Sequence, residues 1–154
     1  MTEPSHRMDP AIRTRWLAAL RSGDYLQGRE LLHYESRPDG SAPRYCCLGV
    51  LCDLAYRDGV IDRVQGFMST SYGYLPPDGA DEEQTTVEVS VLPPAVARWA
   101  GLVDADGVPI TTPRAEGVEL TVWNDGEAAL TADGPNVRSH TFAEIADLIE
   151  RSDL

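Results

Sequence analysis

A run of small and apolar residues over 45–58, YCCLGVLCDLAYRD, constrains the fold more than any other segment. Its apolar side chains recur at helical spacing and Gly59 can end a helix, so the run predicts a buried helix. Gly49 lies inside this helix, where glycine costs about 1 kcal/mol relative to alanine. We therefore expect Gly49 to allow a neighbouring segment to pack closely against the helix.

Amphipathic helices are predicted near both ends of the chain. Asp9 followed by proline is a favourable helix start, and apolar residues then recur at helical spacing, which predicts a helix over 10–22. Thr141 and Glu144 form a capping box before a C-terminal amphipathic helix. A shorter helix is predicted over 93–101.

The signals for strands are weaker. Residues 66–92 predict a two-stranded hairpin, because PPDG at 76–79 favours a turn and valines alternate with polar residues over 87–91. The segment 118–125 begins with a similar alternation and fits either a strand or a single turn of helix. Residues 126–140 are expected to form a loop.

The chain of 154 residues has the length of one domain. We expect an α+β fold in which three or four short helices pack on a small antiparallel hairpin or sheet. In this prediction residues 10–154 form a single compact domain, and residues 1–9 form a flexible N-terminal tail.

The charge balance excludes several classes of function. Thirteen basic residues stand against 25 acidic ones, for a net charge of −12. This balance argues against binding to nucleic acid or to an anionic membrane, since both need basic patches. All the basic residues are arginine, which excludes a P-loop and a lysine Schiff base. No segment has the length of a membrane helix or the apolar core of a signal peptide, so we expect a cytoplasmic protein.

Three cysteines, Cys46, Cys47 and Cys52, lie close together in the predicted central helix. Their odd number and close spacing differ from a disulfide framework and indicate reduced thiols. They lack the CxxC spacing of a zinc site, and the DADG sequence at 104–107 lacks the later ligands of a calcium loop. The sequence therefore predicts no metal and no cofactor.

One of these cysteines is a candidate nucleophile. If Cys46 lies at a helix N-terminus, the helix dipole favours its thiolate, and His140 or His33 could act as the base. The side chains that could orient such a base are Asn124, Asp125 and Asn136. The alternative is that the cysteines only pack the helix against the core, since free cysteine is among the most buried residue types.

Aromatic residues offer two candidate contact surfaces. Trp123 adjoins Asn124 and Asp125, and an exposed aromatic ring beside polar groups is typical of a contact residue. A second surface is predicted on the hairpin, from Phe67, Tyr72 and Tyr74. Trp16 and Trp99 lie on apolar helix faces and are expected in the core. Two arginines that converge could hold a phosphate or a carboxylate.

Five segments, in this order, carry a resemblance: WLAALRSGDYLQG, YCCLGVLCDLA, LPPAVARWAGL, WND and FAEIADLIE. Together they resemble a family of small uncharacterised proteins encoded in phages and prophages, especially of actinobacteria. The family has no assigned activity, so the resemblance implies a context and not a mechanism. Its members usually join the ND segment to the last helix by a shorter loop than residues 126–140 form here.

Three classes of function follow from these observations. The leading hypothesis is an acidic binding protein that engages and modulates a host protein with a basic surface, for example as an inhibitor of host defence or regulation. The second is a protein that sequesters a nucleotide-like signal, which predicts converging arginines and an aromatic platform. The third is a cysteine hydrolase built on Cys46. Association of two copies through exposed aromatic rings is a further possibility.

Overall fold

The computed structural model describes residues 8–35, 43–65, 71–79, 83–84, 86–126, 138–152 and 154. The helices in this part of the chain are α1 (Pro10–Arg21), α2 (Cys47–Arg57), α3 (Pro94–Ala100), α4 (Leu120–Asp125) and α5 (Phe142–Glu150). The strands are β1 (Leu26–Gln27), β2 (His33–Glu35), β3 (Pro43–Tyr45), β4 (Asp62–Gln65), β5 (Ser71–Leu75), β6 (Arg114–Ala115) and β7 (Val118–Glu119). The predicted α+β class is confirmed.

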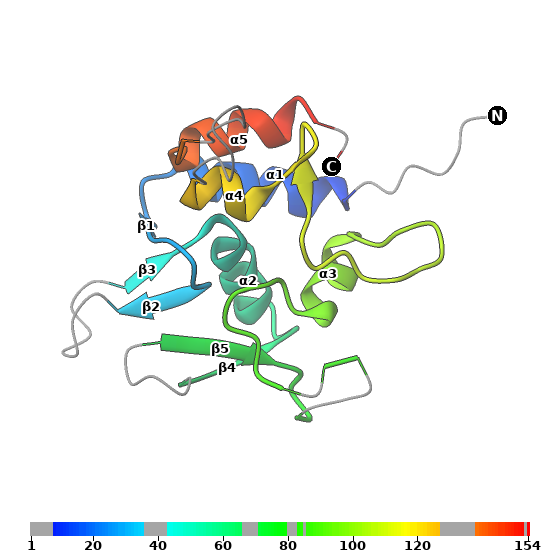
Figure 1. The fold of residues 1–154 in the computed structure, drawn as a ribbon. Helices are drawn as coiled ribbons and strands as arrows, with labels where there is room; N and C mark the ends of the chain where they lie inside the picture. Colours follow the sequence, from blue (N-terminus) through cyan, green and yellow to red (C-terminus); the bar gives the residue numbers. More distant parts are fainter. Residues whose placement is uncertain are drawn as a thin grey trace, which may run out of the picture.

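Helix α2 lies at the centre of the fold, with α1, α4 and α5 on one side and β4 and β5 on the other (Figure 1). Every residue from Cys47 to Ala55 is buried, which confirms the prediction of a buried helix. A Cβ atom at Gly49 would lie 1.7 Å from the carbonyl oxygen of Leu32. The close packing expected at Gly49 is therefore real, and the segment that approaches is the one leading into β2.

The main sheet is mixed, with strand order β1-β3-β2-β5-β4. Strand β1 is parallel to β3, and the other neighbouring strands are antiparallel. Two antiparallel strands, β6 and β7, form a separate small sheet.

The hairpin predicted over 66–92 is reduced to one antiparallel bridge between its two arms. Strand β5 pairs with β2 and β4, which both precede it, whereas the segment after the turn makes one isolated bridge, between Tyr74 and Glu88. This segment packs closely at Gly73, where a Cβ atom would lie 2.1 Å from a methyl carbon of Val87. The segment therefore runs beside β5, where Tyr74 and Glu88 exchange backbone hydrogen bonds, and the N–H of Leu32 donates to the carbonyl of Val89 at 2.8 Å. Phe67 lies outside the described residues.

Two local predictions are confirmed at helix boundaries. Asp9 caps α1, since its carboxylate accepts from the N–H groups of Ala11 and Ile12, and Thr141 forms the expected capping box of α5. The sequence left open whether 118–125 is strand or helix. In the structure its first two residues are strand β7 and the rest is helix α4. Met8 is buried and the Asp9 N–H donates to the carbonyl of Ala100, so the packed part of the chain begins before residue 10.

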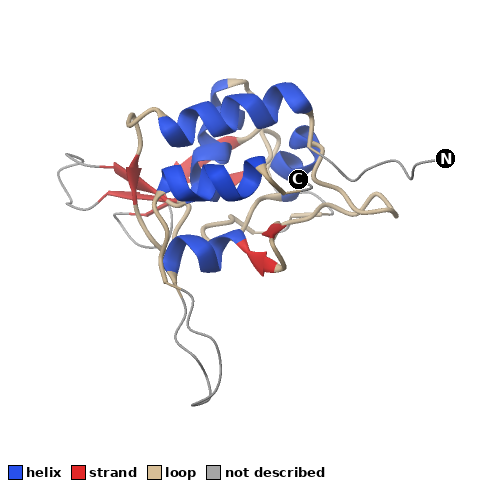
Figure 2. Ribbon diagram, turned by 90° about the horizontal axis from the view of Figure 1, so that it is seen from above, coloured by secondary structure: helices blue, strands red, loops and turns tan. Residues whose placement is uncertain are grey.

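The first and last helices lie side by side (Figures 1 and 2). The guanidinium of Arg13 on α1 donates to the carbonyls of Ile149 and Glu150, at 2.7 and 2.8 Å, at the C-terminal end of α5. Trp16 is completely buried on α1 and donates to the carbonyl of Cys47 at 3.0 Å, whereas Trp99 is half-buried. Among the described residues no helix is both long enough and apolar enough to cross a membrane.

Candidate functional site

Cys46 occupies the predicted position at the N-terminus of α2, where it is the N-cap residue. Its side chain is only 1% exposed, and burial raises the pKa of the thiol to about 12, although the N–H groups of Leu48 and Gly49 act in the opposite direction. Desolvation therefore exceeds the effect of the helix N-terminus. The thiol is protonated at neutral pH, which contradicts an activated nucleophile at Cys46. Cys47 and Cys52 are also buried.

Asn124 joins segments that are far apart in the sequence. Its Oδ1 accepts from the N–H of Cys47 at 3.2 Å and from Nε2 of Gln27 at 3.0 Å, and its Nδ2 donates to the carbonyl of Gly28 at 2.8 Å. A further bond links Nδ2 to the carboxylate of Asp125. The side chain is completely buried. Asn124 therefore connects these segments, and it does not belong to an exposed contact surface with Trp123, because all of its polar atoms are used internally.

Gln27 extends this arrangement to the start of α5. Its Nε2 also donates to the carbonyl of His140 at 2.7 Å, and its Oε1 accepts from the N–H of Phe142 at 3.0 Å. One amide on β1 thus fixes α4 and α5 relative to the sheet. No periodicity in the sequence marks Gln27, because its partners lie about a hundred residues away.

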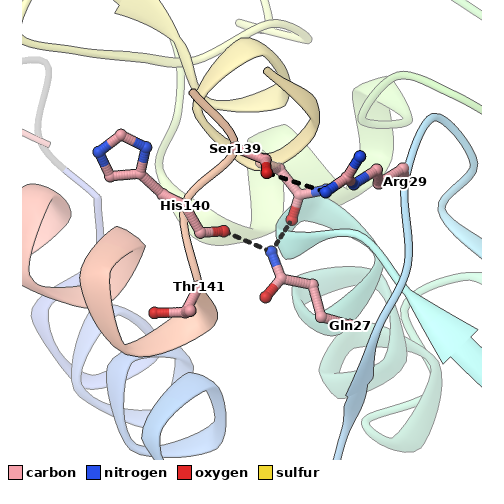
Figure 3. A pocket seen from close by; sticks show the side chains of 6 residues that line it. Gln27, Arg29, Ser139, His140 and Thr141 are labelled. Carbon is pink, nitrogen blue, oxygen red and sulfur yellow. Dashed lines mark hydrogen bonds between the residues drawn. The ribbon is translucent and has the colours of Figure 1, made fainter. Parts of the chain in front are cut away.

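A small polar cavity opens beside this amide pair (Figure 3). It has a volume of about 220 Å³ and is lined by Gln27, Arg29, Asn124, Ser139, His140 and Thr141. The guanidinium of Arg29 donates to the hydroxyl of Ser139 at 2.8 Å, whereas the ring of His140 points away from Gln27 and Ser139 (Figure 3). The cavity is polar, but its two amide side chains already have partners.

The remaining residues predicted around α4 are also held in place. The ring nitrogen of Trp123 donates to the carbonyl of Ala115 at 2.8 Å, and the indole is half-buried. The ring of His140 meets the indole edge-on, with the two ring centroids 4.9 Å apart. Asp125 accepts from the N–H of Glu30, at 3.1 Å. Glu30 has a φ of 69°, so Asp125 stabilises a left-handed turn that a non-glycine residue rarely adopts. Asn136 lies outside the described residues.

The two described tyrosines of the second predicted surface differ in burial. Tyr74 is completely buried against α2, so the expectation that it belongs to an exposed surface is wrong. Tyr72, on the same face, is half-buried, and its ring stacks on His33 at 4.7 Å. The reason is that α2 covers this face of β5, which the alternation of the strand does not reveal.

His33 lies inside an aromatic stack. Its ring lies between the rings of Tyr45 and Tyr72, with centroid distances of 4.3 and 4.7 Å. These two residues lie opposite His33 on β3 and β5. His33 is 4% exposed, and burial, together with Arg63, lowers its pKa to about 4. Its Nδ1 makes no hydrogen bond within the described part of the chain. The imidazole is therefore neutral at neutral pH.

Within the described residues, no group of three or more His, Cys, Asp or Glu side chains is placed to hold a metal ion. The DADG segment forms the predicted turn, in which the Asp104 carboxylate accepts from the N–H groups of Asp106 and Val108.

Comparison with known proteins gives one match. Residues 8–153 match the family described as "Domain of unknown function (DUF8296)". No curated protein and no solved structure matches the chain significantly.

Proposed function

The chain belongs to the DUF8296 family, and from this premise we propose that it is a binding protein that engages and modulates a protein with a basic surface. In this proposal it is encoded by a phage or prophage and acts in the host cytoplasm, for example as an inhibitor of host defence or regulation. The family description names no activity, so the support comes from the charges of the chain itself.

The observation that carries the proposal is how the arginines are used. Ion pairs with carboxylates hold most of the described arginines: Arg15, Arg21, Arg57, Arg63, Arg98, Arg114, Arg138 and Arg151. These ion pairs offset positive charge with carboxylates of the chain itself, and the net charge of the whole chain remains −12. A field of this sign steers association toward a basic partner and suppresses binding to acidic ones.

The buried thiols support a binding role over hydrolysis. A cysteine hydrolase needs an accessible thiolate, and Cys46 has neither the exposure nor the pKa of one. The small-molecule alternative has its own support, because Arg57 and Arg63 converge on Asp53 beside tyrosine rings.

The test is native mass spectrometry after capture from an actinobacterial lysate, followed by association rates with the captured protein over a salt series. We expect a stoichiometric protein adduct whose association slows as the ionic strength rises. Asp24, Asp62, Asp78 and Asp106 are exposed, and changing all four to Asn is expected to slow association further. The matched control changes the same four residues to Glu, which keeps the charge.

Two results would refute the proposal. One is an association that neither salt nor the four Asn substitutions affect. The other is a chain that retains no protein at all under low-salt capture. The same spectra measure whether the chain is a monomer or a homodimer.

A further inference from the structure

Asp53 is a buried carboxylate that holds two guanidiniums. It is 3% exposed and lies on α2. Its Oδ2 accepts from the hydroxyl of Tyr25 at 2.5 Å and from Nε of Arg57 at 2.9 Å, and its Oδ1 lies 3.6 Å from Nη1 of Arg63. A helix residue, a strand residue and a loop residue thus meet at one carboxylate.

Tyrosine rings fix the second guanidinium in place. The Cζ atom of Arg63 lies 4.4 Å from the ring centroid of Tyr56 and 5.6 Å from that of Tyr72. These distances are typical of cation–π contacts, which orient a guanidinium without using its N–H groups. Arg63 is therefore held by two rings and one carboxylate, and its side chain remains 26% exposed.

The donors of both arginines remain largely available. Arg57 contacts Asp53 through Nε, and its side chain is 68% exposed. Its two terminal nitrogens make no hydrogen bond to the described residues, and among the same residues the N–H groups of Arg63 have one polar contact, the long one to Asp53. Two guanidiniums therefore present N–H groups to solvent from one place.

The local charge differs in sign from that of the whole chain. Two cations share one carboxylate, so the group has one positive charge in excess, whereas the chain carries −12. Neighbouring His33 adds no charge at neutral pH. An anion would supply the missing negative charge and would accept from both guanidiniums.

We propose that Arg57 and Arg63 form a binding site for a phosphate group, with Asp53 and Tyr56 as positioning residues. Arginine forks match phosphate oxygens, and a phosphate has enough terminal oxygens to accept from two arginines at once. The group is either free phosphate or the phosphate of a nucleotide, whose base has the exposed ring of Tyr56 nearby for stacking. This site does not depend on the proposed protein partner.

The experiment is a titration of the full chain by calorimetry at low salt, with inorganic phosphate, AMP and acetate as probes. We expect phosphate and AMP to bind and acetate to bind far more weakly. Tighter binding of AMP would identify a nucleotide as the source, and equal binding would identify free phosphate. Absence of binding by both phosphate probes at millimolar concentration would overturn the site.

Three variants localise the binding. R57Q and R63Q are each expected to weaken it about tenfold to hundredfold, the value of a hydrogen bond to a charged group. R15Q is the matched control, because Arg15 also pairs with one carboxylate, Asp58, at the surface. Equal weakening by R15Q and R57Q would show general screening and refute the site. Arg57 is exposed, so R57Q decides the question even if R63Q fails to fold.

Discussion

Replacing Gly49 by alanine sets two physical effects against each other. Alanine has the higher helix propensity, and in an open helix position the change would stabilise the protein by about 1 kcal/mol. At Gly49 the added Cβ would lie 1.7 Å from the carbonyl oxygen of Leu32 and 2.6 Å from its carbonyl carbon. Both of these atoms belong to the backbone, so no side-chain rotation can relieve the overlap.

The size of the stability loss depends on how far the backbone at Leu32 must move. The segment at Leu32 has to retreat from α2 by more than about 1 Å, and it is tied down by the bond from the Leu32 N–H to the carbonyl of Val89, at 2.8 Å. Overpacking of a close-packed core costs typically 1–3 kcal/mol, and backbone contact places this site at the upper end. After the gain in propensity, Gly49→Ala should lower the free energy of unfolding by about 2 kcal/mol.

Urea unfolding, followed by circular dichroism and tryptophan fluorescence, measures this change. With a urea dependence of about 2 kcal/mol per M, the midpoint should fall by about 1 M. Ala18→Gly, at an exposed position of α1, is the control for propensity alone and should cost about 1 kcal/mol. A Gly49→Ala protein as stable as the original, or more stable, would refute the close contact.

Three further predictions concern the buried polar groups. Asn124→Ala leaves the N–H of Cys47 and the carbonyl of Gly28 buried without that partner, so urea unfolding should show a loss of at least about 2 kcal/mol; a loss under 1 kcal/mol would contradict this. A thiol reagent at pH 8 should label none of the three cysteines in the native protein and all three in urea, and rapid labelling of a native thiol would contradict their burial. The pKa of His33 is about 4 in the fold, against about 6.5 in an unfolded chain, so between these values the unfolded state binds more protons and stability falls with falling pH. In His33→Gln this decline should be shallower, and identical pH profiles would refute the assignment.

The parts of the fold that could be predicted are those whose signal is local. The N-cap at Asp9, the capping box at Thr141 and the burial of α2 each depend on residues within a few positions of one another. The strand β4, by contrast, reads DRVQ and is mostly exposed, so no apolar alternation marks it. Its pairing with β5, and the parallel pairing of β1 with β3, depend on contacts between separate segments.

For the candidate site too, the sequence indicates what depends on neighbouring residues and not what depends on distant ones. Trp123, Asn124 and Asp125 are neighbours in the sequence, but nothing in the sequence indicates that Gln27 and Gly28 use the amide of Asn124. The alternation of β5 places Tyr72 and Tyr74 on one face, yet only tertiary packing decides that α2 covers this face. The convergence of Arg57 and Arg63 depends on Asp53, and sequence spacing does not show which carboxylate two arginines will share.

The pairing of α1 with α5 also determines when the chain can fold during its synthesis. Arg13 bonds to carbonyls at residues 149 and 150, so α1 leaves the ribosome long before its partner exists. Until then, the apolar side of α1 has no α5 to cover it, and Gln27 lacks its acceptor at His140. Contacts of such separation form late, because the intervening loop must close first. The core is therefore completed only after α5 has been synthesised, and a chain truncated before residue 142 would emerge without the helix that covers α1.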